Sequence, residues 1–134
     1  MHDGRTRKVD SIEPERLEPF LTLHRASITI LRGPAAGSEY TLEKRRSILG
    51  RSAEVEIQIE DPSVSSEHVA FELGADGFGI RDLASTNGVQ LNGANILAAD
   101  LKHGDRISLG ECEFQYVIED RTPETRSWSV EEDA

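Results

Sequence analysis

The chain has 134 residues, of which 37% are hydrophobic and 30% are charged, and its formal net charge is −10. That length is enough for one folded domain with a hydrophobic core. The negative charge argues against general binding to nucleic acids or anionic membranes, because no long basic patch is present to replace counterions. The single cysteine, Cys112, excludes an internal disulfide and a cysteine-based zinc cluster. Any anion that this protein binds must therefore be held by a local site of specific geometry.

The first 25 residues contain equal numbers of basic and acidic residues and one short apolar stretch, LEPFLTLHR. Pro14 and Pro19 limit helix formation there. We interpret residues 1–25 as a flexible arm whose apolar stretch docks on the domain or on a partner; the alternative is plain disorder. The N-terminus lacks the apolar core of a signal peptide, and no apolar run approaches the roughly 20 residues of a membrane span. A cytoplasmic protein without membrane contact is therefore expected.

Residues 26–118 consist of short segments in which apolar and polar residues alternate, separated by turn residues. This alternation predicts strands with one buried face, and the spacing of the turns predicts an all-β sandwich. Asn92-Gly93 favours a two-residue hairpin turn, because both positions of such a turn need a positive φ. The segments predicted as strands are SITIL (27–31), EYTLE (39–43), SIL (47–49), VEIQI (55–59), HVAFEL (68–73), FGIRDL (78–83), VQLNGANIL (89–97, a hairpin), RISL (106–109) and EFQYVI (113–118).

The last 16 residues differ in composition from the predicted strands. Residues 119–134 hold six acidic and two basic residues and one isolated aromatic side chain, Trp128. This composition is typical of a solvated tail. We therefore expect a β-sandwich domain at residues 26–118 between a flexible N-terminal arm and a flexible, acidic C-terminal tail.

Three polar segments stand at strand ends or in loops: LGR (49–51), SVSSEH (63–68) and DLASTNG (82–88). Gly50 permits a close backbone approach, and Arg51 offers a planar fork of donors that suits phosphate or carboxylate. The hydroxyls and amides of the other two segments add neutral donors, and this combination suits a compact dianion such as a phosphoryl group. Taken singly, each segment also fits a structural role: a surface arginine, a turn, or a serine and histidine that stabilise a loop.

The order and spacing of these segments resemble the forkhead-associated (FHA) domain. The resemblance runs from about Ser27 to about Ile118 and includes VQLNG and LKHGDRISLG. It implies a two-sheet β-sandwich of about eleven strands, with loops at one end that bind phosphothreonine in a partner peptide. The implied function is that of a signalling adaptor in Ser/Thr kinase pathways, in the manner of small single-domain bacterial adaptors.

The resemblance assigns roles to residues by position. Arg51 and Ser65 match the family's phosphate-binding residues, and Thr86 matches a residue that reaches the phosphate or the adjoining backbone. Asn87 matches the asparagine that hydrogen-bonds the peptide main chain. Ser66 stands where the family often has asparagine or arginine, so the additional contact expected there is weaker or comes from its hydroxyl or backbone. The positions that match structural supports of the site are Gly50, His68 and Gly88.

An enzymatic interpretation makes Ser65 or Ser66 a nucleophile and His68 its base. The sequence has no G-x-S-x-G segment, and His68 begins an alternating strand, so its ring is expected to point inward. We therefore expect no enzymatic activity and no cofactor. A metal site is not expected either, because the histidines lack ligand spacing; they are His2, His24, His68 and His103. The stronger alternative is a phosphate-independent interaction or scaffold module on the same fold.

The expected partner is a phosphothreonine-containing protein, such as a Ser/Thr kinase or one of its substrates. Thr6, Thr122 and Thr125 lie in the charged arms, where a kinase can reach them. A phosphorylated arm that binds the Arg51 site of its own chain would be autoinhibitory, because tethering raises its effective concentration to the millimolar range. Binding between two chains would produce self-association instead.

Overall fold

Eleven strands and one short helix make up residues 19–121, the part of the chain that the computed structural model describes. The arm residues 1–18 and the tail residues 122–134 lie outside the described residues, and with them Thr6, Thr122 and Thr125. The elements are α2 (Pro19–Leu23), β1 (His24–Arg32), β2 (Glu39–Thr41), β3 (Arg46–Gly50), β4 (Ile57–Gln58), β5 (Val69–Gly74), β6 (Gly77–Asp82), β7 (Val89–Leu91), β8 (Ala94–Ile96), β9 (Ala98–Asp100), β10 (Arg106–Leu109) and β11 (Cys112–Asp120).

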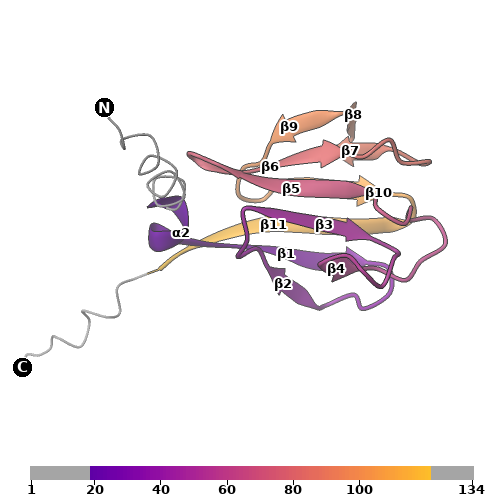
Figure 1. Cartoon of the computed structure of the whole chain (residues 1–134), viewed down its shortest axis with the longest axis horizontal. Helices are drawn as coiled ribbons and strands as arrows, with labels where there is room; N and C mark the ends of the chain where they lie inside the picture. The colour runs from indigo at the N-terminus through magenta and orange to yellow at the C-terminus, as the bar shows by residue number, and fades with distance from the viewer. Residues whose placement is uncertain (1–18, 122–134) are drawn as a thin grey trace, which may run out of the picture.

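The strands form two sheets that face each other (Figure 1). The six-stranded sheet has the order β2-β1-β11-β10-β7-β8, and the five-stranded sheet has the order β4-β3-β5-β6-β9. The pair β3–β4 is parallel, whereas the long pairs β1–β11 and β5–β6 are antiparallel. The predicted all-β sandwich of about eleven strands is thereby confirmed. The predicted hairpin is confirmed too: β7 pairs with β8, and Asn92 and Gly93 have φ values of 51° and 89°.

The core lies between the sheets and follows from the alternation along each strand. Ile28 and Ile30 of β1 pair in register with Tyr116 and Phe114 of β11, and all four are buried. Tyr116 also joins the two sheets, since its hydroxyl accepts a hydrogen bond from the Phe78 amide of β6 at 3.2 Å. Burial raises the pKa of this hydroxyl, so it stays protonated in the physiological range.

The folded part begins before residue 26, the boundary expected from the sequence. Helix α2 buries Phe20, whose ring lies 6.3 Å from the Phe78 ring, centroid to centroid, in an edge-to-face arrangement. Pro19 is the first helical residue, a position that tolerates proline because its missing N–H would be unsatisfied there anyway. The proline thus starts a short helix, and the apolar stretch LEPFLTLHR contributes to the core.

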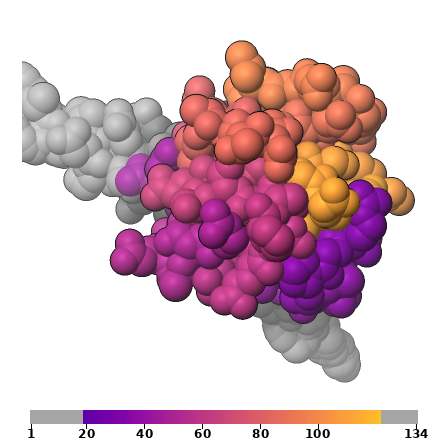
Figure 2. All heavy atoms as spheres, turned by 90° about the vertical axis from the view of Figure 1, so that its right-hand side faces the viewer, coloured from indigo at the N-terminus to yellow at the C-terminus, as the bar shows by residue number. Residues whose placement is uncertain are grey.

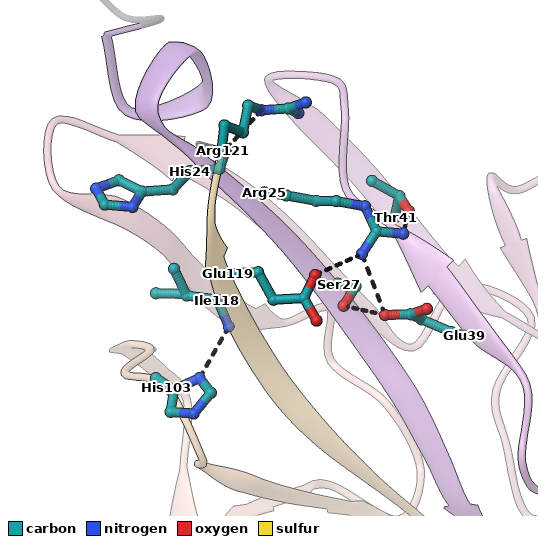
Figure 3. A network of polar contacts seen from close by, with 9 residues as sticks. All are labelled: His24, Arg25, Ser27, Glu39, Thr41, His103, Ile118, Glu119 and Arg121. Atoms are coloured by element: carbon teal, nitrogen blue, oxygen red, sulfur yellow. Dashed lines mark hydrogen bonds and ion pairs between the residues drawn. The ribbon is translucent and has the colours of Figure 1, made fainter. Parts of the chain in front are cut away.

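The outer face of the six-stranded sheet is polar near the chain ends. Figure 3 shows Arg25 between the carboxylates of Glu39 and Glu119, at 3.4 and 3.3 Å. The Ser27 hydroxyl donates to Glu39 at 2.7 Å, and this bond, with the Arg25 contact, lowers the pKa of that carboxyl. Because the three ion-paired side chains are partly exposed to solvent, each ion pair contributes at most about 1 kcal/mol.

The first and last described residues and the candidate loops lie at opposite ends of the sandwich. In Figure 1, α2, the start of β1 and the end of β11 are on the left, whereas the loops after β3, before β5 and after β6 are on the right. Figure 2 looks onto that right-hand end. Within residues 19–121, no helix is long and apolar enough to cross a membrane.

Candidate functional site

Three loops converge at the end of the sandwich that lies on the right in Figure 1. They are residues 51–56 between β3 and β4, 59–68 between β4 and β5, and 83–88 between β6 and β7. They carry the three polar segments identified in the sequence. β3 and β5 are antiparallel neighbours, as are β5 and β6. The end of β3, the start of β5 and the end of β6 therefore lie side by side at one end of the five-stranded sheet. This topology brings together residues that are more than 30 positions apart in the sequence.

Gly50 lets the first two loops approach closely. A Cβ atom at this position would overlap the backbone carbonyl of Ser66, so any other residue would force the two loops apart. Directly after it, the Arg51 amide donates to the Ser65 carbonyl at 2.9 Å, and the Ser52 amide donates to the Ser66 carbonyl at 3.2 Å. The position of Arg51 relative to Ser65 is therefore fixed by backbone contacts.

The Arg51 side chain is anchored at one nitrogen. Its Nε–H donates to the Val64 carbonyl at 2.9 Å, which leaves the two terminal nitrogens with the remaining N–H donors. Arg51 is exposed, and in residues 19–121 no carboxylate forms an ion pair with it. The arginines that do pair with carboxylates there are Arg25, Arg32, Arg46, Arg81 and Arg106.

His68 connects the second and third loops from beneath. Its ring is fully buried, and its Nδ1 accepts a hydrogen bond from the Ser65 amide at 3.0 Å. Because an amide can only donate, Nδ1 carries no proton, and Nε2–H donates to the Gly88 carbonyl at 2.9 Å. The Nδ1 lone pair that a catalytic base would use is already occupied, so this geometry supports a bracing role.

Ser65 connects the same two loops at the surface. Its hydroxyl oxygen accepts a hydrogen bond from the Thr86 amide at 3.1 Å, which leaves the hydroxyl proton available to donate to a ligand. Asn87 lies beside it, and its Nδ2 donates to the Ser63 carbonyl at 2.8 Å. The side-chain oxygen of Asn87 accepts no hydrogen bond from the described residues, so it can receive a peptide amide.

Ser63 is a site residue that the sequence interpretation missed. Its amide and its hydroxyl both donate to Asp61 Oδ1, at 2.9 and 2.6 Å, and these two bonds lower the pKa of Asp61. An aspartate that accepts from the backbone two residues later forms an Asx turn. The signal was present as Asp-Pro-Ser at residues 61–63, a typical turn sequence.

The side chains of this region line a cavity of about 110 Å³. It collects four of the five residues expected to bind phosphopeptide; Ser66 is exposed and does not line it. The expected supports Gly50, His68 and Gly88 do not line the cavity. The lining residues are Arg51, Pro62, Ser63, Val64, Ser65, Thr86 and Asn87.

The chemistry of this cavity is that of an anion receptor. It offers a cation and a hydroxyl donor, and it offers no free general base. Among the described residues, no three His, Cys, Asp or Glu side chains are grouped so as to hold a metal ion. The arrangement can therefore bind a dianion through charge-assisted hydrogen bonds, which are roughly twice as strong as neutral ones.

Comparisons with known proteins found a matching family model and similar solved structures. A family model described as "Inner membrane component of T3SS, cytoplasmic domain" matches residues 29–120. A solved structure from an analysis of phosphothreonine-dependent FHA domain interactions is similar, with a TM-score of 0.64 and 27% identity, covering 69% of this chain and 95% of that chain.

Two curated relatives are regulators by name. The glycogen accumulation regulator GarA of Mycolicibacterium smegmatis is 28% identical over 102 residues, which are 76% of this chain and 65% of that protein. The oxoglutarate dehydrogenase inhibitor of Corynebacterium jeikeium is 31% identical over 92 residues, which are 69% of this chain and 64% of that protein. The chain thus spans just under two thirds of the length of these relatives.

Proposed function

The chain belongs to the forkhead-associated family, and from that premise we propose that it binds phosphothreonine peptides and acts as an adaptor in Ser/Thr kinase signalling. The partner on this proposal is a phosphorylated protein, such as a kinase or a kinase substrate, in the cytoplasm. The names of the two curated relatives, a regulator and an inhibitor, fit a protein that acts by binding rather than by catalysis.

The observation that carries this proposal is the arginine at the cavity. Arg51 is held in place by its own backbone and by Nε, while its terminal nitrogens are unpaired at a cavity that Ser65 also lines. A phosphoryl group there accepts from the guanidinium and from the Ser65 hydroxyl. The Asn87 amide group lies at the same rim and receives the peptide main chain. In a domain with excess negative charge, this local cation provides the affinity.

The preference for phosphothreonine over phosphoserine rests on the apolar part of the same lining. Pro62 is its exposed apolar member and is suited to pack against the γ-methyl of threonine, whereas the Val64 side chain is buried in the core. Burying one methyl group is worth about 1 kcal/mol, or several-fold in affinity. We expect phosphoserine peptides to bind several-fold more weakly than matched phosphothreonine peptides.

The test is titration of a phosphothreonine peptide, its phosphoserine form and its unmodified form by calorimetry. Hydrogen bonds to charged groups contribute about 1.5–3 kcal/mol, so Arg51→Ala should weaken phosphopeptide binding by about tenfold to a hundredfold. The matched control is Arg81→Ala, which removes the same charge from the outer face of the five-stranded sheet, where Arg81 pairs with Glu72.

Three outcomes would contradict the proposal. If Arg51→Ala binds the phosphopeptide as tightly as the wild type, the phosphate does not bind at this cavity. If the unmodified peptide binds as tightly as the phosphorylated one, the chain is a phosphate-independent module on the same fold. Hydrolysis of ester substrates that is lost in Ser65→Ala would favour the enzymatic interpretation.

A further inference from the structure

A second cavity adjoins the proposed phosphate cavity. It has a volume of about 310 Å³ and extends from the loop residues Ser63 and Asn87, which it shares with the first cavity, onto the outer face of the six-stranded sheet. A peptide held at Arg51 and Asn87 therefore passes beside it. We call it the Glu111 cavity; its lining residues are Ser63, Asn87, Gln90, Ser108, Gly110 and Glu111.

The walls of the Glu111 cavity are held in a defined geometry. The Ser63 hydroxyl accepts a hydrogen bond from the Glu111 amide at 2.8 Å while it donates to Asp61. Gly110 has a φ of 56°, and a Cβ atom on it would overlap Ser63, so the turn at residues 110–111 lies tightly against the loop at Ser63. A ligand would meet a formed cavity at little ordering cost.

The charge of this cavity is negative and local. Its lining contains one ionisable side chain, Glu111, together with neutral polar groups. The carboxylate is exposed and takes part in none of the ion pairs formed within residues 19–121. Arg32 lies nearby but donates its Nε–H to the Glu111 backbone carbonyl at 3.2 Å and pairs its terminal nitrogen with Glu113 at 3.4 Å. The cavity thus presents an unneutralised carboxylate beside the anion receptor.

We propose that the Glu111 cavity binds a lysine or arginine side chain of the phosphothreonine peptide. This inference rests on the proposed function and specifies the peptide: a basic residue close in sequence to the phosphothreonine. The cation pairs with the Glu111 carboxylate, and the hydroxyl oxygen of Ser108 and the side-chain oxygens of Gln90 and Asn87 accept hydrogen bonds from its remaining N–H groups. The two adjoining cavities then bind groups of opposite charge: a phosphate at Arg51, and an ammonium or guanidinium group at Glu111.

The experiment is a phosphothreonine peptide series in which one flanking position at a time, from four before to four after, carries Lys, Ala or Asp. At one position we expect Lys to bind about two- to fivefold more tightly than Ala, the range of a largely exposed ion pair. Glu111→Gln should abolish that difference and leave the Ala peptide unchanged, and Glu111→Lys should favour Asp there. Glu67→Gln is the control, because Glu67 is also exposed and also takes part in no ion pair within residues 19–121.

The outcomes separate this inference from the proposed function. If all peptides bind in an Arg51-dependent way and none shows a preference for Lys at any position, the inference about the Glu111 cavity fails while the proposed function stands. A Lys preference that survives Glu111→Gln, or that is lost equally in Glu67→Gln, would overturn it as well. If no phosphopeptide binds the wild type, both the proposed function and this inference fail.

Discussion

Ser65 has its backbone amide and its hydroxyl oxygen engaged within the protein: the amide donates to His68 and the oxygen accepts from the Thr86 amide. Only the hydroxyl proton is left for a ligand. Arg51 is arranged in the same way, with Nε bound to Val64 and the terminal nitrogens free. At the scale of single residues, Ser65 and Arg51 are therefore held by contacts within the protein and keep other donors for a ligand, which is the preorganisation that lowers the cost of binding.

Replacing Ser65 with alanine tests this double role. Ser65→Ala removes a donor to the phosphate and leaves the Thr86 amide without its acceptor, so we expect phosphopeptide affinity to fall about tenfold. Hydrogen exchange at the Thr86 amide should become faster in the free protein. Ser66→Ala is the matched control, since Ser66 is exposed and does not line the cavity. An equally large loss of affinity in Ser66→Ala would contradict the assignment of the phosphate contact to Ser65 rather than Ser66.

At the scale of elements, most strands followed from local patterns, whereas β9, helix α2 and the order of the strands in the sheets did not. Alternation located the strands, and Asn92-Gly93 located a hairpin whose two positive φ values the structure shows. Pro19 limits a helix that runs through it but is tolerated as the first helical residue, and the long-range contact between Phe20 and Phe78 helps to hold the five-residue helix in place. The Asp61–Ser63 turn is visible in the sequence, but its bond to Glu111, 48 positions away, depends on strand pairing that one sequence does not show.

Helix α2 gives a prediction at this scale. Phe20 is buried and packs edge-to-face on Phe78, so Phe20→Ala should lower the free energy of unfolding by about 3–4 kcal/mol. Urea unfolding measures this change. Leu23→Ala is the control on the same helix, because Leu23 is 60% exposed and should cost less than about 1 kcal/mol. Equal stabilities of Phe20→Ala and wild type would show that α2 does not contribute to the core in solution.

The described domain separates the loops of the candidate site from its first and last residues. The loops of the candidate site lie at one end of the sandwich and the first and last described residues lie at the other (Figure 1). β11 links the two ends: Glu111, at the second cavity, immediately precedes it, and Arg121 immediately follows it. Its nine residues span about 30 Å at roughly 3.3 Å per residue. A ligand for the Arg51 cavity that belongs to the same chain must therefore cross the length of the domain.

This distance decides how a phosphorylated tail can bind. Thr125 is four residues beyond Arg121, so its Cα atom reaches at most about 14 Å from the end of the domain, and its phosphorylated side chain is too short to span the remaining distance to its own Arg51. We expect a chain phosphorylated at Thr125 to form concentration-dependent dimers or larger assemblies, measured by size-exclusion chromatography with light scattering, and Arg51→Ala in the same chain to abolish them. Mixing phosphorylated Arg51→Ala with unphosphorylated wild type should restore a one-to-one complex, because one chain then supplies the phosphate and the other the receptor. A monomer at every concentration whose site nevertheless resists an added phosphopeptide would show binding within one chain and would contradict the reach argument.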